Sequence, residues 1–190
     1  MDIKNNENPE ICKKCGGRCC QNAGCSITSE DFQKSYGEIN PESIKRALNT
    51  GFVTLTYRSA QKYEDVGYEC VNSVYLLYYL KMRARNADKF GFILPDAGPC
   101  RMWSSDKGCR LSWDNRPSGG KVLVPKWSSG YGYECHILES LKDDGIESDV
   151  DLSIKSWLPY QGILNEVANE FYNKGYEPDI LEMFPEFHDA

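Results

Sequence analysis

The chain reads C-K-K-C-G-G-R-C-C-Q-N-A-G-C over residues 12–25, and this stretch holds five of its nine cysteines. So many thiols so close together either form disulfides or bind a metal ion. Disulfides require specific separations and directions of the Cα and Cβ atoms, and adjacent cysteines such as Cys19 and Cys20 rarely pair with each other. A soft metal ion, by contrast, gathers several thiolates from one tight loop. The stretch therefore predicts a metal site.

The expected compartment also favours a metal over disulfides. Residues 1–8 show no apolar core and no cleavage signal, so we expect no secretory leader. No stretch approaches the roughly 18 apolar residues of a membrane span. We therefore expect a cytoplasmic protein without a membrane segment, in a compartment where structural disulfides are rare. The odd number of cysteines argues the same way, and disulfides are kept as the less favoured alternative.

Size and composition predict one α+β domain. With 190 residues and 41% hydrophobic content, the chain is long enough for a single core. We expect a small, loop-rich domain stapled by a cysteine–metal cluster and carrying a C-terminal helix. The expected boundaries are a flexible N-terminus over 1–11, a metal-binding domain over 12–175 and a tail over 176–190. The net charge of −6 argues against a nucleic-acid partner.

The first half of the domain predicts two helices and two strands. Ser26–Phe32 supplies an N-cap candidate and acidic first-turn residues, with the helix ending near Gly37. A second helix opens at 40–42, with proline at its first position, and ends at Gly51. Residues 52–57 alternate as a strand does. The apolar run 74–80 favours a buried strand, although its pattern alone also permits a helical turn.

The second half predicts loops followed by helix. Residues 88–125 are rich in Gly, Pro, Asp and Ser, which is typical of loops, with a short strand at 121–124. The acidic segment 143–151 predicts an exposed connection. From 152 to 174 the pattern is helical, Pro159 kinks or restarts the helix, and Gly175 closes it. One apolar face of this helix is expected in the core: Tyr160, Leu164, Val167 and Phe171.

Three later cysteines complete the candidate ligand set. Cys100 and Cys109 lie in turn-forming surroundings, and Cys135 follows within a Tyr-Glu-Cys-His sequence. The eight-residue interval between the first two is a weak zinc signal by itself. Cys70 precedes the buried run and is interpreted as an ordinary buried thiol. The remaining eight suffice for two tetrahedral all-thiolate sites or one polynuclear cluster: Cys12, Cys15, Cys19, Cys20, Cys25, Cys100, Cys109 and Cys135.

The spacing C-x2-C-x3-C-C resembles the YkgJ-type cysteine-cluster proteins, which are described as zinc- or iron-chelating domains. The likeness extends over roughly residues 12–165 and includes several further blocks. These blocks are Cys20–Phe32, Tyr79–Arg83, Gly98–Cys100, Gly108–Ser112, Arg116–Gly120 and Trp157–Leu164. Many members carry a cysteine shortly after Arg-Pro, whereas this chain has Gly119 and Gly120 there, so Cys135 is the candidate replacement.

The resemblance implies a chelating function and suggests an enzymatic alternative. Flagellin lysine N-methylase is similar in its cysteine motif, so an iron–sulfur protein acting in redox or lysine-methylation chemistry is the second hypothesis. The chain has no Gly-rich loop after a clear strand and no other catalytic motif, so it supplies no support of its own for that chemistry. A metal-ordered adaptor for an unknown protein partner is the third hypothesis.

Zinc is favoured slightly over iron. Thiolates suit both, but the spacing matches neither common ferredoxin pattern. Against this, adjacent cysteines suit polynuclear iron sites. His136 is interpreted as incidental and His188 as solvated. Five arginines surround the second cysteine group, and they are expected to neutralise thiolates and carboxylates more than to form an anion pocket with Trp103 and Trp113: Arg83, Arg85, Arg101, Arg110 and Arg116.

Overall fold

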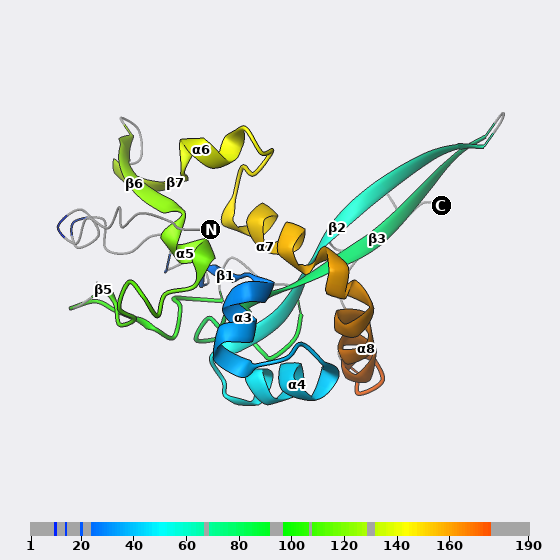
Figure 1. The fold of residues 1–190 in the computed structure, drawn as a ribbon, viewed down its shortest axis with the longest axis horizontal. Coiled ribbons are helices and arrows are strands. Elements are labelled where there is room, and N and C mark those ends of the chain that lie inside the picture. Colours follow the sequence, from blue (N-terminus) through cyan, green and yellow to red (C-terminus); the bar gives the residue numbers. More distant parts are fainter. Residues whose placement is uncertain are drawn as a thin grey trace.

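The structure is a computed structural model. It describes residues 10, 14, 20, 24–66, 69–91, 97–106, 108–128 and 132–175, with the backbone alone at 61–66, 69–73, 125, 126, 128, 133 and 134. These residues form helices and small antiparallel sheets, which confirms the expected mixed α+β class and the C-terminal helix (Figure 1). The helices are α3 (Ser29–Tyr36), α4 (Pro41–Asn49), α5 (Ser118–Lys121), α6 (Glu139–Lys142), α7 (Asp149–Trp157), the 3-10 turn η1 (Leu158–Tyr160) and α8 (Gln161–Tyr172). The strands are β1 (Ser26–Ile27), β2 (Val53–Val66), β3 (Glu69–Met82), β4 (Trp103–Ser104), β5 (Gly108–Cys109), β6 (Leu123–Ser128) and β7 (Gly132–Ile137).

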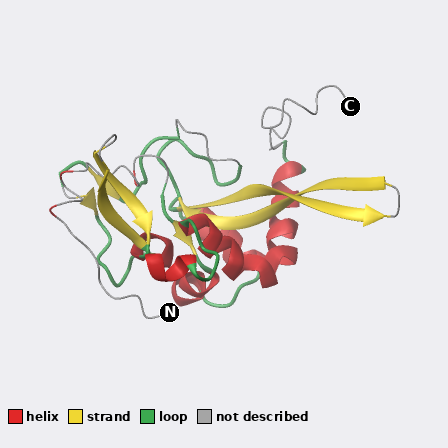
Figure 2. Ribbon diagram, turned by 90° about the horizontal axis from the view of Figure 1, so that it is seen from above, coloured by secondary structure: helices red, strands yellow, loops and turns green. Residues whose placement is uncertain are grey.

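The largest sheet has the strand order β1-β3-β2, and its two long strands form a hairpin. Their pairing runs from Val53 opposite Met82 to Val66 opposite Glu69. The short strand β1 pairs with the inner end of β3, with Ser26 opposite Lys81. Figures 1 and 2 show the outer part of the hairpin extending away from the helices as a narrow ribbon. The strands predicted at 52–57 and 74–80 are thus confirmed, but each is longer than predicted.

The first two helices begin where their capping residues predict. Thr28 caps α3, since its Oγ1 accepts a hydrogen bond from the Asp31 N–H at 3.3 Å. Asn40 caps α4 in the same way through Ser43, and Pro41 occupies the first turn. Gly37 ends α3 with a positive φ of 83°.

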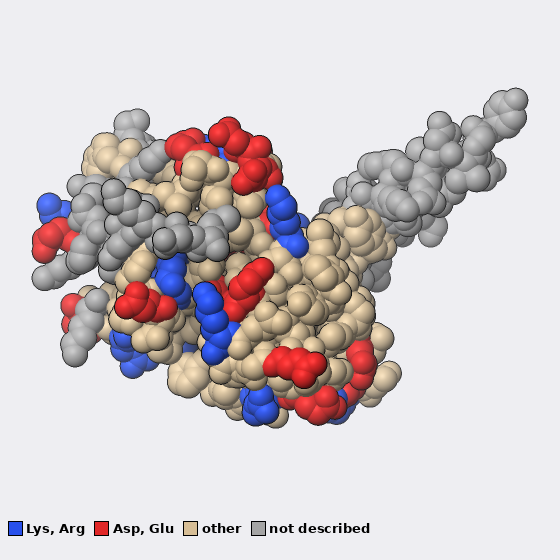
Figure 3. Space-filling view, viewed as in Figure 1, with Lys and Arg blue, Asp and Glu red and all other residues tan. Residues whose placement is uncertain are grey.

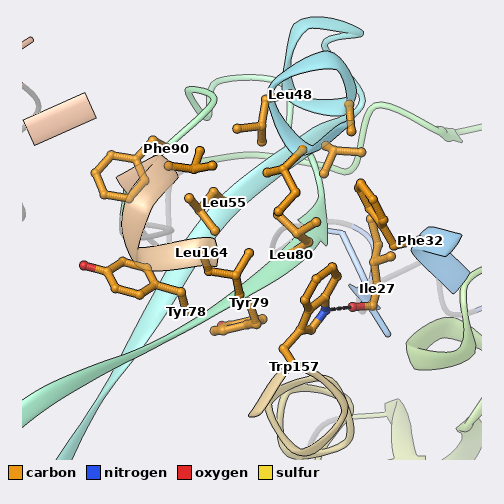
Figure 4. Packing of buried hydrophobic residues seen from close by; sticks show 14 of the residues in the cluster. Ile27, Phe32, Leu48, Leu55, Tyr78, Tyr79, Leu80, Phe90, Trp157 and Leu164 are labelled. Atoms are coloured by element: carbon orange, nitrogen blue, oxygen red, sulfur yellow. Dashed lines mark hydrogen bonds between the residues drawn. The ribbon is translucent and has the colours of Figure 1, made fainter. Parts of the chain in front are cut away.

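The main core lies where α3, α4, α7 and α8 cover the inner part of the β1-β3-β2 sheet (Figure 4). Leu55 and Leu80 of the hairpin are fully buried, as is Leu164 of α8. Trp157 is also fully buried, and its indole N–H donates to the Ile27 carbonyl at 2.7 Å. Because β1 follows the cysteine-rich stretch directly, this core holds the end of that stretch in place.

The C-terminal helices confirm the predicted pattern in part. Leu164 and Val167 are buried, Tyr160 and Phe171 are partly buried, and Pro159 lies in the turn η1 between α7 and α8. Gly175 lies beyond the helix and has a positive φ of 84°. The prediction of an exposed connection over 143–151 was partly wrong. The helix begins earlier, at Asp149, because Ser148 caps it. The Ser148 Oγ accepts a hydrogen bond from the Asp151 N–H, and the Ser148 hydroxyl donates to the Asp151 carboxylate.

A second, smaller core lies beneath the β6–β7 hairpin. It is made of Val122, Ile137, Leu141, Ile146 and Leu152. The strand predicted at 121–124 begins only at Leu123, because residues 118–121 form the short helix α5. Figure 3 shows acidic side chains gathered over α6 and the turn after it. Among the described residues, no helix combines the length and apolar character that crossing a bilayer requires. The predicted tail over 176–190 lies outside the described residues, as does all of 1–11 except Glu10.

Candidate metal centre

Cys25 is held by close backbone contacts at the start of β1. The Met82 N–H donates to the Cys25 carbonyl at 2.9 Å, which fixes the chain at the end of β3. The preceding residue must be glycine, because a Cβ atom on Gly24 would lie 2.4 Å from the Met82 carbonyl oxygen. The backbone just before Cys25 therefore packs so closely against Met82 that no side chain fits at position 24.

Helix α5 closes the same site from another side. Asp31, in the first turn of α3, accepts hydrogen bonds from the Ser118 N–H at 2.6 Å and from the Ser118 hydroxyl at 2.9 Å. This anchor brings Gly119 against β1, where an added Cβ would lie 2.4 Å from the Ser26 carbonyl oxygen. The next residue, Gly120, faces the thiol itself, since its ideal Cβ lies 3.0 Å from Cys25 Sγ.

Helix α7 supplies the third wall around β1. The Asp149 carboxylate accepts a hydrogen bond from the Ser26 N–H at 2.8 Å. One turn later, the Ser153 hydroxyl donates to the Ile27 carbonyl at 2.8 Å, beside the bond from Trp157. All of these partners are far from β1 in the sequence, so the position of Cys25 is fixed by tertiary contacts.

Cys100 and Cys109 approach from the central loops. Cys100 is buried, its N–H donates to the Cys20 carbonyl at 2.5 Å, and an isolated antiparallel bridge joins it to Ala84 just beyond β3. The Met102 N–H points at the Cys100 sulfur, with a nitrogen–sulfur distance of 3.4 Å. Cys109 lies on β5 opposite Trp103, and the Trp103 N–H donates to the Cys100 carbonyl at 3.0 Å. Cys20 and Cys109 are thus both tied to Cys100, the first directly and the second through Trp103.

The electrostatics connect this region to Cys25. Removal from water raises the pKa of the Cys25 thiol well above its usual 9.0. The negative charges of Asp149, Cys100 and Cys109 raise this pKa further, and Lys81 opposes them. Cys25 therefore interacts electrostatically with Cys100 and Cys109, although it lies far from both in the sequence. In the absence of a cation, the Cys25 thiol stays protonated at neutral pH.

The structure unites some of the predicted ligands and leaves others apart. Cys20, Cys25, Cys100 and Cys109 belong to the region just described, whereas Cys12, Cys15 and Cys19 lie outside the described residues. In the parts of the chain that the structure describes, no three Cys, His, Asp or Glu side chains are arranged closely enough to hold a metal ion. The predicted burial of Cys70 is not described either; its backbone lies on β3, opposite Asp65.

Cys135 lies in a different setting. It is on β7 and lines an open cavity of about 300 Å³ with His136, Ile137, Lys142 and Asp149, together with Leu123, Glu147 and Ser148. Cys135 is not among the groups that shift the Cys25 pKa. Asp149 connects the two places, because its carboxylate both lines this cavity and acts on Cys25. Cys135 and His136 each have a further interaction partner, so neither residue is isolated.

Comparisons with known proteins give no relative. No family model, no curated protein and no solved structure matches this chain. The likeness to the YkgJ-type cysteine-cluster proteins therefore stays a prediction that rests on the quoted motifs alone.

Sequence reasoning missed one residue of the site, Asp149, and noted another, Gly120, without placing it beside Cys25. Asp149 was part of a segment predicted as an exposed connection, and only the Ser148 cap before it signals a helix start. Gly120 was noted as a position where the resembling family often has a cysteine. Its contact with Cys25 Sγ gives this difference a spatial meaning, because the substituted position lies beside a candidate ligand.

Proposed function

We propose that the protein binds zinc through a cysteine cluster and that the metal has a mainly structural role. Cys25, Cys100 and Cys109 would contribute thiolates, joined by ligands from Cys12, Cys15, Cys19 and Cys20. The single observation that carries the proposal is that Cys100 and Cys109 act on the buried Cys25 thiol and raise its pKa. Cys135 is kept as a candidate ligand, with the least support.

The chemistry of the donor set fits a soft metal ion. Burial and neighbouring negative charges disfavour ionisation of the Cys25 thiol when no cation is bound. A bound cation would offset this unfavourable energy by stabilising the thiolate. The contact from the Met102 N–H to the Cys100 sulfur at 3.4 Å is of the kind that stabilises a thiolate ligand. Metal binding would release protons, so its affinity would rise with pH.

A structural role follows from the ligand type and from the surrounding loops. Sites made wholly of cysteine tend to be closed, whereas catalytic zinc keeps a coordination position for water. Among the described residues of the segment that contains Cys100 and Cys109, the regular structure consists of the two-residue strands β4 and β5. A metal bound by these cysteines and Cys25 would tie this segment to β1. The proposal requires a reducing compartment such as the cytoplasm.

Replacement of single ligands tests the assignment. We expect Cys25→Ser and Cys109→Ser to lower the zinc content per chain, measured by elemental analysis after gel filtration. Cys70→Ser is the matched control, because Cys70 lies on β3 opposite Asp65, at the hairpin end farthest from Met82 and β1. Cobalt(II) substitution gives a second readout, since each lost thiolate weakens the sulfur-to-cobalt charge-transfer band. Full zinc content and an unchanged band in both variants would contradict the assignment.

A further inference from the structure

The five arginines around the second cysteine group divide into two sets. Arg83 is buried, donates to the Ala87 carbonyl at 2.7 Å and lies 3.7 Å from the Asp88 carboxylate. The Arg116 guanidinium lies 5.6 Å from the centre of the Trp113 ring. Arg83 is thus held inside the fold, and Arg116 packs against an aromatic ring. The remaining three, Arg85, Arg101 and Arg110, differ from them.

Arg85, Arg101 and Arg110 are interlocked through backbone carbonyls. The Arg85 side chain donates to the Trp103 carbonyl at 3.3 Å. The Arg101 side chain donates to the Arg85 and Ala84 carbonyls, each at 3.3 Å, and the Arg110 side chain donates to the Arg101 carbonyl at 2.5 Å. This chain of bonds holds three guanidinium groups on one surface, which we call the arginine surface.

No carboxylate among the described residues neutralises the arginine surface. Within the described residues, Arg85, Arg101 and Arg110 have no carboxylate at ion-pair distance, in a chain whose net charge is −6. Each guanidinium has five N–H donors and uses one or two of them in these bonds, so most of its donors remain for another partner.

An exposed aromatic residue follows the glycine that contacts the arginine surface. A Cβ atom on Gly51 would lie 3.3 Å from Arg101 Nη1, so Arg101 packs against the end of α4. The next residue, Phe52, is 46% exposed. Guanidinium groups next to an exposed aromatic ring match the residue types that dominate protein–protein contacts.

We propose that Arg85, Arg101, Arg110 and Phe52 form a docking surface for an acidic peptide segment of a partner protein. Carboxylates along such a segment would pair with the three guanidinium groups, and one apolar side chain would cover Phe52. A nucleic-acid strand would require a longer basic groove with several stacking rings, whereas this surface offers three guanidinium groups and one ring. This inference stands apart from the metal proposal, because none of its residues is a candidate ligand.

The test is the binding of a short fluorescent peptide composed of Asp, Glu and one Phe, followed by anisotropy. The triple variant Arg85→Gln, Arg101→Gln, Arg110→Gln is expected to bind about tenfold more weakly, because three exposed ion pairs are lost. The charge-matched control is Lys34→Gln, Lys142→Gln, Lys155→Gln on α3, α6 and α7, and its affinity should stay within about twofold of the wild type. Added salt should weaken wild-type binding, and Phe52→Ser should weaken it independently of salt.

Three outcomes would overturn the proposal. They are no binding by the wild type, equal loss in both triple variants, and displacement of the peptide by inorganic phosphate at equal concentration, which indicates a small-anion site. If the triple variant fails to fold by circular dichroism, Arg110→Gln replaces it. This single change removes one exposed guanidinium and should weaken binding about threefold, with Lys155→Gln as its control. Zinc content is measured in parallel and should be equal in all variants.

Discussion

Gly119 shows how single residues fix the site. Its Cα lies against the backbone of Ser26, and an added Cβ would meet the Ser26 carbonyl oxygen at 2.4 Å. Backbone cannot move aside as the end of a side chain can, so we expect Gly119→Ala to lower the free energy of unfolding by about 2–4 kcal/mol. Urea denaturation measures this loss.

Gly162 is the matched control for this change. It also lies in a helix, α8, but an added Cβ meets nothing within 4 Å. Gly162→Ala should therefore be neutral or stabilise the protein by up to about 1 kcal/mol, because alanine restricts the unfolded chain. Equal stability of the two variants would contradict the close approach of α5 to β1.

At the same scale, sequence reasoning identified which residue types matter but not where they meet. The cysteine stretch and the Gly119–Gly120 pair were both noted from the sequence. That Gly120 lies against Cys25 Sγ depends on the anchor between Asp31 and Ser118, which are 87 residues apart. The local sequence around either residue does not predict this contact, because Asp and Ser are both common at helix starts without any distant partner.

At the scale of elements, Trp157 links α7 to β1. Trp157→Phe keeps an aromatic ring in the core but removes the donor to the Ile27 carbonyl. We expect a loss of about 1–3 kcal/mol in the free energy of unfolding, from the lost hydrogen bond and the smaller ring. Trp127→Phe is the control, because Trp127 is 68% exposed on β6 and should change stability by less than about 0.5 kcal/mol. Similar losses for the two variants would refute the role of Trp157.

Asp151 joins α7 to the base of the hairpin through Arg58. Burial alone would raise the pKa of Asp151, but hydrogen bonds from Ser148 and Arg58 and the charge of Arg58 lower it below its usual 3.8. A carboxyl group with a lowered pKa in the folded state contributes stability above about pH 4 and loses it as the pH falls through the folded pKa. Stability should therefore decrease below pH 4.

Asp151→Asn should remove that part of the pH dependence and cost about 1 kcal/mol at neutral pH, where the charge is lost. Thermal unfolding of both proteins between acid and neutral pH measures the difference. A variant whose stability falls as steeply in acid as that of the wild type would show that other groups are responsible.

Local signals predicted some elements well and others incompletely. The starts of α3 and α4 followed from the Thr28 and Asn40 caps, whose hydrogen bonds are local. The hairpin was predicted too short, because its outer residues, such as Gln61 and Asn72, do not alternate in polarity. They lie in strands because the two strands pair across the hairpin, with Gln61 opposite Val74 and Asn72 opposite Tyr63. Helix α5 contains two glycines and depends on Asp31 for its position, so its sequence alone reads as a turn.

At the scale of the whole molecule, the segments that meet around Cys25 come from the N-terminal, central and C-terminal parts of the chain. The mixed α+β class and the closing helix followed from composition and periodicity. The sequence analysis also placed Cys25, Cys100, Cys109 and Cys135 in one candidate ligand set. It left open which of them lie together, because cysteine spacing constrains ligands within a loop and not between loops.

Removal of the metal should weaken the attachment of the Cys100–Cys109 region to β1. If zinc ties the Cys100–Cys109 region to β1, a strong chelator should lower the midpoint of thermal unfolding by several degrees. It should also speed proteolysis within residues 97–110, while the core of α7 and α8 stays protected. Limited proteolysis with mass spectrometry locates the cuts. Cleavage that is unchanged by the chelator would show that the loops are held by protein contacts alone.

The most direct measurement is the content of zinc, iron and acid-labile sulfide per chain in protein purified anaerobically. The account predicts stoichiometric zinc, with neither iron nor sulfide. A brown protein that contains iron and sulfide would show that the same cysteines hold an iron–sulfur cluster in place of zinc. Protein with neither metal would contradict the claim that these cysteines share a metal centre.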